Sequence, residues 1–204
     1  MITIIDYRMG NLGSITNMLN KIGVECLVTN NITEVERAEK LILPGVGSFD
    51  NAINNLNQLN LIEVIKHKAI NEKIPILGIC LGMQLLSEKS EEGSLPGLSL
   101  IHGEVKKFKF SELNALKIPH MGWNLVNKVQ SNPLIDNLPS DSRFYFVHSY
   151  HFVCYNKSDI LLTTNYGYEF VSAIAKSNIL GVQFHPEKSH RFGLQLLKNF
   201  VEQY

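Results

Sequence analysis

The chain has 204 residues, a length that suits a single domain spanning residues 1–204. Its 19 Lys and Arg residues are balanced by 19 Asp and Glu residues, so no positive surplus exists for binding nucleic acid or an acidic membrane surface. The longest apolar stretch, residues 74–83, is too short to span a membrane, and the apolar run at the N-terminus ends too early for a signal peptide. We therefore expect a soluble single-domain protein.

The chain has three cysteines, Cys26, Cys80 and Cys154, which are odd in number and widely spaced. This pattern predicts neither a disulfide framework nor a metal knuckle, and it favours a reducing compartment, the cytoplasm. Cys26 and Cys154 lie in apolar runs and are expected in the core. No spacing of histidines and cysteines typical of a metal site occurs, so we expect no metal and no other cofactor.

The first half of the chain alternates short apolar runs with helical patterns. The apolar runs predict strands at residues 2–5, 24–28, 40–43 and 74–79. Apolar residues at helical spacing predict helices at residues 11–22, 49–56, 61–70 and from 81 onward. This alternation is typical of a parallel sheet with helices on both faces, and uninterrupted apolar strands fit burial on both sides.

In the second half, strands follow one another more closely, with turn residues between them. They are predicted at residues 105–110, 144–150, 160–164, 170–175 and 179–184, before a final helix at 190–204. Their hairpin-like spacing predicts antiparallel additions to the sheet, and residues 87–98 are expected to form a polar surface loop. The predicted fold class is α/β, with three layers and a mostly parallel sheet that has antiparallel additions.

The segment Gly78-Ile79-Cys80-Leu81-Gly82 follows an apolar strand and opens a helical pattern. It matches the G-x-nucleophile-x-G elbow, in which a sharp turn projects one side chain above the sheet and glycines avoid clashes around it. The helix N-terminus favours a reactive thiolate, and the Leu81 amide is expected to point to a developing oxyanion. The alternative is that Cys80 is only a small buried residue between glycines.

A second candidate segment is Phe184-His185-Pro186-Glu187, at the end of an apolar strand. In an extended chain the side chains of His185 and Glu187 share a face, and Pro186 favours that geometry. A carboxylate beside an imidazole fixes its tautomer and stabilises its charged form. Together with the elbow cysteine, these residues complete a nucleophilic set. The alternative is a solvated loop in which Glu187 pairs only with Lys188.

The segment Leu43-Pro44-Gly45-Val46-Gly47-Ser48 lies between a predicted strand and helix, where open α/β sheets place ligand loops. Val46 or Gly47 could supply a second backbone donor to an oxyanion. A tight turn without function is an equally good interpretation of this segment alone. The glycine spacing does not match a phosphate loop.

The motifs around Gly45, Cys80 and His185, in this order, resemble those of the class I (triad) glutamine amidotransferases. The segments Pro119-His120-Met121-Gly122-Trp123-Asn124 and Phe144-Tyr145-Phe146-Val147-His148-Ser149-Tyr150 look like those of the glutaminase subunits of imidazole glycerol phosphate synthase. The resemblance covers nearly the whole chain. It implies a flavodoxin-like fold of the class I glutamine amidotransferase type.

The resemblance also implies roles for individual residues. Cys80 would attack the side-chain amide carbon of L-glutamine, His185 would transfer protons, and Glu187 would orient His185. The oxyanion would be held by backbone groups of Val46, Gly47 and Leu81. The glutamine would be held by Gly45, Gln84, His148, Ser149 and Tyr150.

A partner is implied as well. Ammonia would pass to a cyclase subunit with a (β/α)₈ barrel, in a heterodimer that forms imidazole glycerol phosphate and aminoimidazole carboxamide ribonucleotide in histidine biosynthesis. The segment near that partner would comprise Pro119, His120, Met121, Gly122, Trp123 and Asn124. From the residues alone, Trp123 could equally be a core anchor.

Three other functions stay open at this stage. A paralogous glutaminase could supply ammonia to an amidotransferase acting on surface-polysaccharide sugars, because the residues after Ser189 and the 90–98 loop depart from the histidine-pathway pattern. A regulatory module could keep the fold without the chemistry, although all three triad positions are intact. A cysteine hydrolase is disfavoured by Gln84 and the His148-Ser149-Tyr150 segment.

Overall fold

The computed structural model describes residues 1–111 and 116–204. Its α-helices are α1 (Leu12–Lys21), α2 (Ile32–Glu36), α3 (Phe49–Gln58), α4 (Leu61–Ile70), α5 (Leu81–Leu85) and α6 (His190–Gln203). Its strands are β1 (Ile2–Ile5), β2 (Cys26–Thr29), β3 (Leu41–Leu43), β4 (Ile76–Ile79), β5 (Lys89–Ser90), β6 (Gly103–Lys107), β7 (His120–Leu125), β8 (Asn127–Lys128), β9 (Arg143–His148), β10 (Tyr150–Cys154), β11 (Ile160–Tyr166), β12 (Tyr168–Lys176) and β13 (Ile179–Val182).

The main sheet runs in the order β2-β1-β3-β4-β13-β12-β10-β6-β5, with β11 and β8 attached beside β12. The first five strands in this order are parallel to one another. β12 pairs antiparallel with both β13 and β10, and β10 pairs antiparallel with β6. The predicted α/β class, with a mostly parallel sheet and antiparallel additions, is confirmed.

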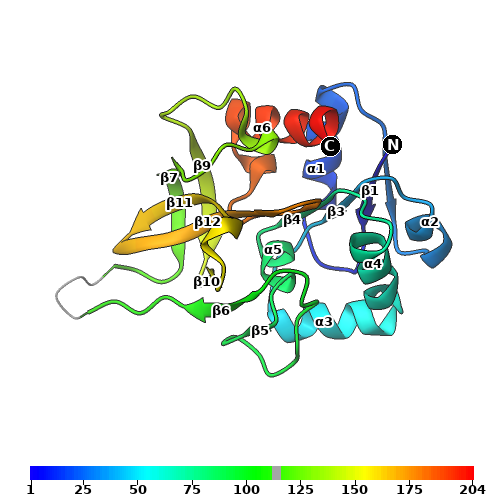
Figure 1. Cartoon of the computed structure of the whole chain (residues 1–204), viewed down its shortest axis with the longest axis horizontal. Helices are drawn as coiled ribbons and strands as arrows, with labels where there is room; N and C mark the ends of the chain where they lie inside the picture. The colour runs from blue at the N-terminus through cyan, green and yellow to red at the C-terminus, as the bar shows by residue number, and fades with distance from the viewer. Residues whose placement is uncertain (112–115) are drawn as a thin grey trace.

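Helices cover both faces of the parallel half of the sheet. α1 and α6 lie on one face, and α3, α4 and α5 lie on the other (Figure 1). Side chains alternate between the two faces, so that Ile4 packs in the cluster with Ile15 and Leu196, whereas Ile5 packs with Leu56 and its neighbours. In the described part of the chain, no helix is long and apolar enough to cross a membrane.

The predicted strand at 179–184 differs from expectation in direction and length. It ends at Val182, and it is antiparallel only to β12, while its other edge pairs parallel with β4. Hairpin spacing reports only how a strand pairs with its neighbour in sequence. The insertion of β13 beside β4, in the middle of the sheet, is a long-range pairing that this spacing does not reveal.

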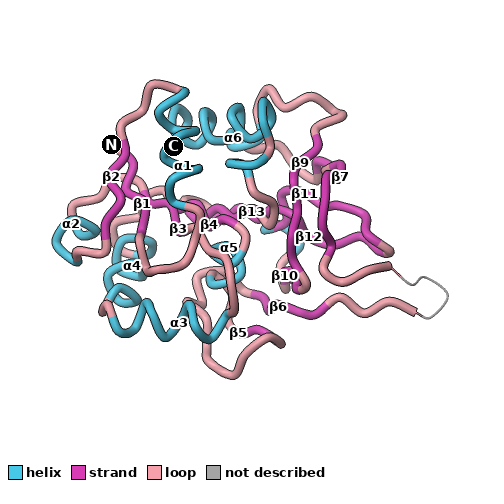
Figure 2. The backbone as a smooth tube through the Cα atoms, turned by 180° about the vertical axis from the view of Figure 1, so that it is seen from behind, coloured by secondary structure: helices cyan, strands magenta, loops and turns pink. Residues whose placement is uncertain are grey.

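The predicted strand at 144–150 is two strands that belong to different sheets. β9 pairs antiparallel with β7 in a separate two-stranded sheet, which stands beside β11 and β12 (Figure 2). β10 begins at Tyr150, which pairs with Lys107 of β6. The alternation of buried side chains at Phe144, Phe146 and His148 leads directly into the next strand, so periodicity does not mark the change of sheet at Ser149.

Several elements were not predicted, among them α2, β5, β7 and β8. α2 is only five residues long, too short for helical periodicity, but the Asn31 side chain caps it by accepting from Thr33 N–H and Glu34 N–H. β5 lies within the predicted loop at 87–98. β7 places Met121, Trp123 and Leu125 on an exposed face, the reverse of the usual pattern for a strand on a core.

The start of α5 packs directly against the end of β3. A Cβ atom added to Gly82 would lie 1.8 Å from Leu43 O, so only glycine fits this contact. Gly78 is similarly enclosed, because its added Cβ would lie 2.7 Å from Gly82 O. The glycines on both sides of Cys80 therefore allow the turn to pack against the sheet.

We predict that Gly82→Ala lowers the free energy of unfolding by about 1–3 kcal/mol, because the added methyl group must displace β3 or α5. Urea unfolding of the full chain measures the change. The matched control is Gly13→Ala in α1, where no atom lies within 4 Å of the added Cβ. There alanine should stabilise the chain by roughly 0.5–1 kcal/mol. A Gly82→Ala variant as stable as the unaltered chain would contradict the packing argument.

Candidate active site

Cys80 lies at the sharp turn between β4 and α5. Its backbone has φ +55° and ψ −109°, a conformation that non-glycine residues rarely adopt and that is characteristic of functional sites. Cys80 N–H donates to Val182 O at 2.8 Å, and Gln84 N–H donates to Cys80 O at 3.2 Å. The turn is thus tied to β13 and α5, and the thiol sits at the carboxyl edge of the sheet with the residue only 6% exposed.

His185 follows β13, so it and Cys80 extend from the carboxyl ends of adjacent parallel strands. Its Nδ1 lies 2.7 Å from Glu187 Oε1, and both side chains are 2% exposed. The sequence predicts this pair through an extended backbone. In the structure a single 3-10 turn, Pro186–Lys188, brings Glu187 back to the imidazole ring.

The backbone around His185 is held by Ser189, which sequence reasoning did not single out. Ser189 Oγ donates to His185 O at 2.6 Å and accepts from Tyr145 N–H at 3.0 Å. His185 N–H in turn donates to Tyr145 O at 2.9 Å. Ser189 is fully buried, so these bonds fix the imidazole loop against β9.

The environment of His185 favours its charged form. Burial opposes the charge, but contacts with the side chains of Cys80 and Glu187 outweigh burial and raise the pKa of His185 to about 10. Because Nδ1 is bonded to the carboxylate, Nε2 is the nitrogen that remains for proton exchange. Among the described groups, only the Cys80 side chain remains as a contact for Nε2, and it is not within hydrogen-bonding geometry in this conformation. Thiol, imidazole and carboxylate therefore form an ordered set in which His185 can pass a proton to or from a reacting group.

The loop at 45–47 packs against the start of α5, and a carbonyl group of the loop occupies one predicted oxyanion donor. Gly45 O accepts a hydrogen bond from Leu81 N–H at 3.3 Å. The amide expected to hold an oxyanion is therefore engaged in this conformation. Gly45 is tightly enclosed, because an added Cβ would lie 2.4 Å from Tyr7 Oη. Gly47 has φ +114°, which requires glycine.

A cavity of about 300 Å³ opens above Cys80, a size at the lower end of small-molecule sites. It brings together most of the residues predicted for catalysis and substrate binding. Its lining residues are Val46, Gly47, Cys80, Leu81, Gln84, Glu92, Pro119, Val147, His148, Ser149, Tyr150 and His185. Gly45 and Glu187 lie outside the lining, behind Leu81 and His185 respectively.

The predicted substrate residues on the cavity wall bond to one another. Gln84 Nε2 donates to Tyr150 O and to Gln183 Oε1, each at 3.0 Å. His148 Nδ1 lies 2.7 Å from the same Tyr150 oxygen. Gln84 and His148 are both buried, so these contacts order the wall rather than leave it open to solvent.

The segment predicted to face a partner divides into two sides. Met121 and Trp123 are 61% and 43% exposed, whereas His120 is 3% exposed. Pro119 alone of the segment lines the cavity. Gly122 and Asn124 are half-buried on the same side of β7 as His120. The Trp123 ring stacks on His190 with 5.4 Å between centroids, at the surface and not in the core.

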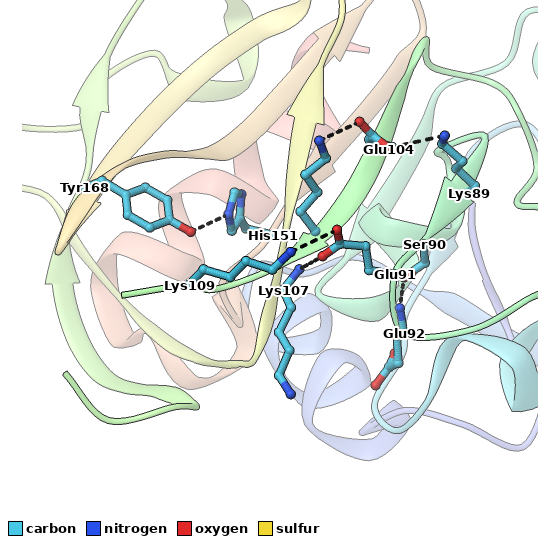
Figure 3. Close-up of polar contacts among 10 residues, drawn as sticks. Lys89, Ser90, Glu91, Glu92, Glu104, Lys107, Lys109, His151 and Tyr168 are labelled. Carbon is cyan, nitrogen blue, oxygen red and sulfur yellow. Dashed lines mark hydrogen bonds and ion pairs between the residues drawn. The ribbon is translucent and has the colours of Figure 1, made fainter. Parts of the chain in front are cut away.

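The sequence analysis missed two polar residues, one that lines the cavity and one that contacts Cys80. Glu92, in the predicted polar loop, lines the cavity, and burial raises the pKa of its carboxyl. Its backbone N–H is bonded to Ser90, beside the ion pairs of Glu91 and Lys109 (Figure 3). Gln183 points its Nε2 at Cys80 Sγ, 3.8 Å away. Neither residue belongs to a recognisable motif, because Glu92 lies in a predicted polar loop and Gln183 is a single glutamine in an apolar run. Only the fold brings them near the active site.

The sequence profile of the family described as "Glutamine amidotransferase class-I" matches residues 3–204. The chain therefore belongs to the class I glutamine amidotransferases. Within this family it is 57% identical to imidazole glycerol phosphate synthase subunit HisH 2 of Methanococcus maripaludis, over all of both chains. It is 46% identical to the protein of the same name from Pseudomonas aeruginosa, over 99% of both chains.

Solved structures share the fold at much lower identity. PurLQS from Thermotoga maritima matches with a TM-score of 0.73 at 16% identity, over 99% of this chain and 97% of that chain. A glutamine amidotransferase from Thermotoga maritima matches with a TM-score of 0.63 at 20% identity, over all of this chain and 81% of that chain. The arrangement of strands and helices is thus that of this class.

We predict that Glu187→Gln lowers the pKa of His185 from about 10 toward its ordinary value near 6.5, because the carboxylate stabilises the imidazolium. An NMR titration of the imidazole signals measures the change. Folding raises this pKa, so His185 stabilises the native chain fully below about pH 6.5 and loses this contribution as pH rises toward 10. In Glu187→Gln, the stabilising contribution of His185 should be lost completely at a lower pH than in the unaltered chain.

The matched control for this titration is Glu88→Gln, which removes a carboxylate from the exposed pair with His102, where Glu88 Oε1 lies 2.6 Å from Nδ1. That change should leave the His185 titration as it is. An unaltered His185 titration in Glu187→Gln would show that the buried carboxylate does not set the charge of the imidazole.

Proposed function

We propose that this chain is the glutaminase subunit of an imidazole glycerol phosphate synthase, which releases ammonia from L-glutamine for histidine biosynthesis. The observation that carries the proposal is the buried set of Cys80 and His185, which line a small cavity, and Glu187, which bonds to His185 outside the lining. Membership of the class I glutamine amidotransferases and the names of the relatives support the same activity. A regulatory module without chemistry would not need an ordered nucleophilic set.

In the proposed reaction, the Cys80 thiolate attacks the side-chain amide carbon of glutamine and the carbonyl oxygen becomes an oxyanion. His185 Nε2 then donates its proton to the leaving nitrogen, so that ammonia departs and a thioester remains. A water molecule attacks the thioester, His185 takes up its proton, and glutamate leaves as Cys80 is regenerated. Glu187 keeps Nδ1 bonded throughout, which leaves Nε2 aimed at the reacting atoms.

Residues of the cavity wall are proposed to bind glutamine. The carboxylate of Glu92 suits the α-ammonium group, since it is the acidic side chain among the lining residues. Gly45, Gln84, His148, Ser149 and Tyr150 are proposed to shape the rest of the pocket. In this proposal the wall orients glutamine with its amide carbon over Cys80.

Activation in this proposal requires one peptide to rotate. The Gly45–Val46 peptide unit contains both the carbonyl that occupies Leu81 N–H and the Val46 N–H. Turning this unit over would release the Leu81 amide and aim the Val46 amide at the oxyanion, with Gly47 beside it. The closed arrangement therefore corresponds to a resting state with low activity.

The partner in this proposal is a cyclase subunit that receives the ammonia, in a heterodimer, with a (β/α)₈ barrel as the acceptor domain. The exposed apolar side chains of Met121, Trp123 and Leu125 form a face for such a contact. Ammonia that escapes into neutral water becomes protonated and loses its nucleophilicity. Docking over the cavity shields it, and Pro119 connects the docking segment to the cavity. The cytoplasmic location stays a prediction.

We predict that a diazo-ketone analogue of glutamine alkylates Cys80, because that thiol lines the cavity proposed to hold glutamine. Peptide mass spectrometry of the treated chain locates the adduct. Cys26→Ala and Cys154→Ala are matched controls and should not reduce labelling, whereas Cys80→Ala should abolish both labelling and glutamine hydrolysis. Labelling of Cys26 or Cys154 in place of Cys80 would overturn the assignment.

We predict that the isolated chain hydrolyses glutamine at least about 100-fold more slowly than its complex with the cyclase subunit, because an occupied oxyanion donor removes roughly that factor. Steady-state release of glutamate, measured with and without saturating partner, gives the ratio. The proposed activation fails if the isolated chain is as fast as the complex.

Genetic complementation tests which molecule accepts the ammonia. The gene, supplied with its cognate cyclase, should restore growth without histidine to a strain that lacks its own glutaminase subunit. Methanococcus maripaludis has two relatives, numbered 1 and 2, at 50% and 57% identity to this chain, so a growth test is more decisive than similarity. Persistent auxotrophy with folded, glutamine-hydrolysing protein would exclude the histidine acceptor and leave an acceptor such as a polysaccharide sugar.

A further inference from the structure

A continuous series of hydrogen bonds joins the inner side of β7 to the thiol of Cys80. It begins at Asn124, whose Oδ1 accepts from Leu125 N–H at 2.8 Å and whose Nδ2 donates to Asn165 O at 2.9 Å. Both bonds involve backbone groups with a fixed donor or acceptor role, so the orientation of the Asn124 amide is determined. The same Nδ2 lies 3.2 Å from His120 Nε2. His120 Nε2 must therefore accept.

A backbone group also determines which nitrogen of His148 carries the proton. Tyr150 O can only accept, so His148 Nδ1, 2.7 Å away, donates to it. His120 Nδ1 and His148 Nε2 lie 3.0 Å apart. Since Nε2 of His120 accepts, its Nδ1 carries the proton and donates to His148 Nε2. Both rings are consequently neutral Nδ1–H tautomers, and every bond in the series has one direction.

The surroundings of the two rings preserve this arrangement. His120 lies between Tyr166 and Phe146, with ring centroids 4.0 and 4.8 Å away and interplanar angles of 28° and 29°. His148 packs against Phe108 and Phe170, each at 5.2 Å. Burial lowers the pKa of His120 to about 4 and lowers the pKa of His148 as well. Neutral rings held in an aromatic cage act as rigid connectors rather than as proton acceptors.

From Tyr150 the series continues to the nucleophile. Gln84 Nε2 donates to Tyr150 O and to Gln183 Oε1, and Gln183 Nε2 points to Cys80 Sγ. His148 and Gln84 thus share one carbonyl oxygen. A shift of His148 changes the position of that oxygen, and therefore of Gln84 on the cavity wall.

We propose that His120 and His148 are positioning residues that convert the placement of β7 into the geometry of the glutamine pocket. The exposed side of β7 carries Met121, Trp123 and Leu125, while its inner side carries His120 and Asn124. The inference rests on the proposed function in one respect, that the partner contacts the exposed side. A partner that moves β7 would then adjust the pocket through the histidine pair.

The tautomers are tested first, on the full chain without partner or substrate. Long-range ¹H–¹⁵N NMR spectra of the imidazole rings, assigned with His120→Asn and His148→Asn, should show neutral Nδ1–H forms for both residues. Neutral free histidine prefers the other tautomer, so this result requires the series of bonds. An Nε2–H form or an imidazolium at either residue at neutral pH would overturn the proposal.

The effect on function is tested by a matched pair of variants in the complex with the cyclase subunit. His120→Asn keeps an N–H donor near the Nδ1 position, whereas His120→Leu removes the donor at similar volume. His120→Leu should raise the KM for glutamine about tenfold, the usual cost of leaving one buried acceptor unpaired, with a smaller effect on kcat. His120→Asn should restore the KM to within about threefold of the unaltered chain.

A purely structural role predicts a different outcome, because partial unfolding reduces the amount of active enzyme and so lowers kcat without changing the KM. That result in His120→Leu would overturn the proposal. If the leucine variant does not fold, His120→Gln replaces it, since its longer side chain carries the amide past the Nδ1 position. Val28→Ala on the edge strand β2, a site 39% exposed and far from β7 in the strand order, is the control and should leave the KM at saturating partner and the His148 tautomer unchanged.

The two proposals fail in distinguishable ways. Absence of glutamine hydrolysis by the complex would contradict the proposed function. The ring tautomers would still test the proposed network in that case. The network also predicts that His120→Leu displaces the NMR signals of the Gln84 side-chain amide, whereas His120→Asn does not.

Discussion

The parallel pairing of β4 with β13 is the constraint on which the site depends. It sets Ile79 opposite Val182, so that the residues after each strand emerge side by side at the carboxyl edge of the sheet. Cys80 N–H continues the ladder by donating to Val182 O. The thiol and the imidazole are separated by about a hundred residues of chain, yet their distance is set by one backbone register. A slip of that register by one residue would reverse the faces of the strand and separate the two groups.

The strained turn at Cys80 is held by its neighbours rather than by its own preference. A positive φ at a cysteine persists only where surrounding contacts exceed its cost, which is of order 1–3 kcal/mol. Here β3, β4 and α5 approach so closely that side chains at Gly78 and Gly82 have no space. The same close packing buries the thiol and brings the loop at 45–47 against it.

Sequence patterns anticipated the parallel half of the fold and the catalytic segments because both depend on local chemistry. Apolar strands, helix periodicity and the glycines around Cys80 are visible within a few residues. The pairing of β13 with β4, the crossing at Ser149 and the outward-facing strand β7 depend on long-range pairing, which no local pattern encodes. Glu92 and Gln183 were missed for the same reason, since neither has a motif, and only the fold brings Glu92 to the cavity and Gln183 to Cys80. The contact of Glu187 with His185 was anticipated, but through a different backbone geometry.

The hydrogen bond from Leu81 N–H to Gly45 O has an electrostatic consequence. A carbonyl oxygen carries the negative end of the peptide dipole, and here that end lies beside the position at which negative charge would develop on a substrate. In the proposed reaction, the closed loop would therefore repel the intermediate in addition to withholding a donor. The proposed rotation of this single peptide would reverse the sign of the local field, so that in this proposal a small movement of the backbone separates an idle chain from one that consumes glutamine.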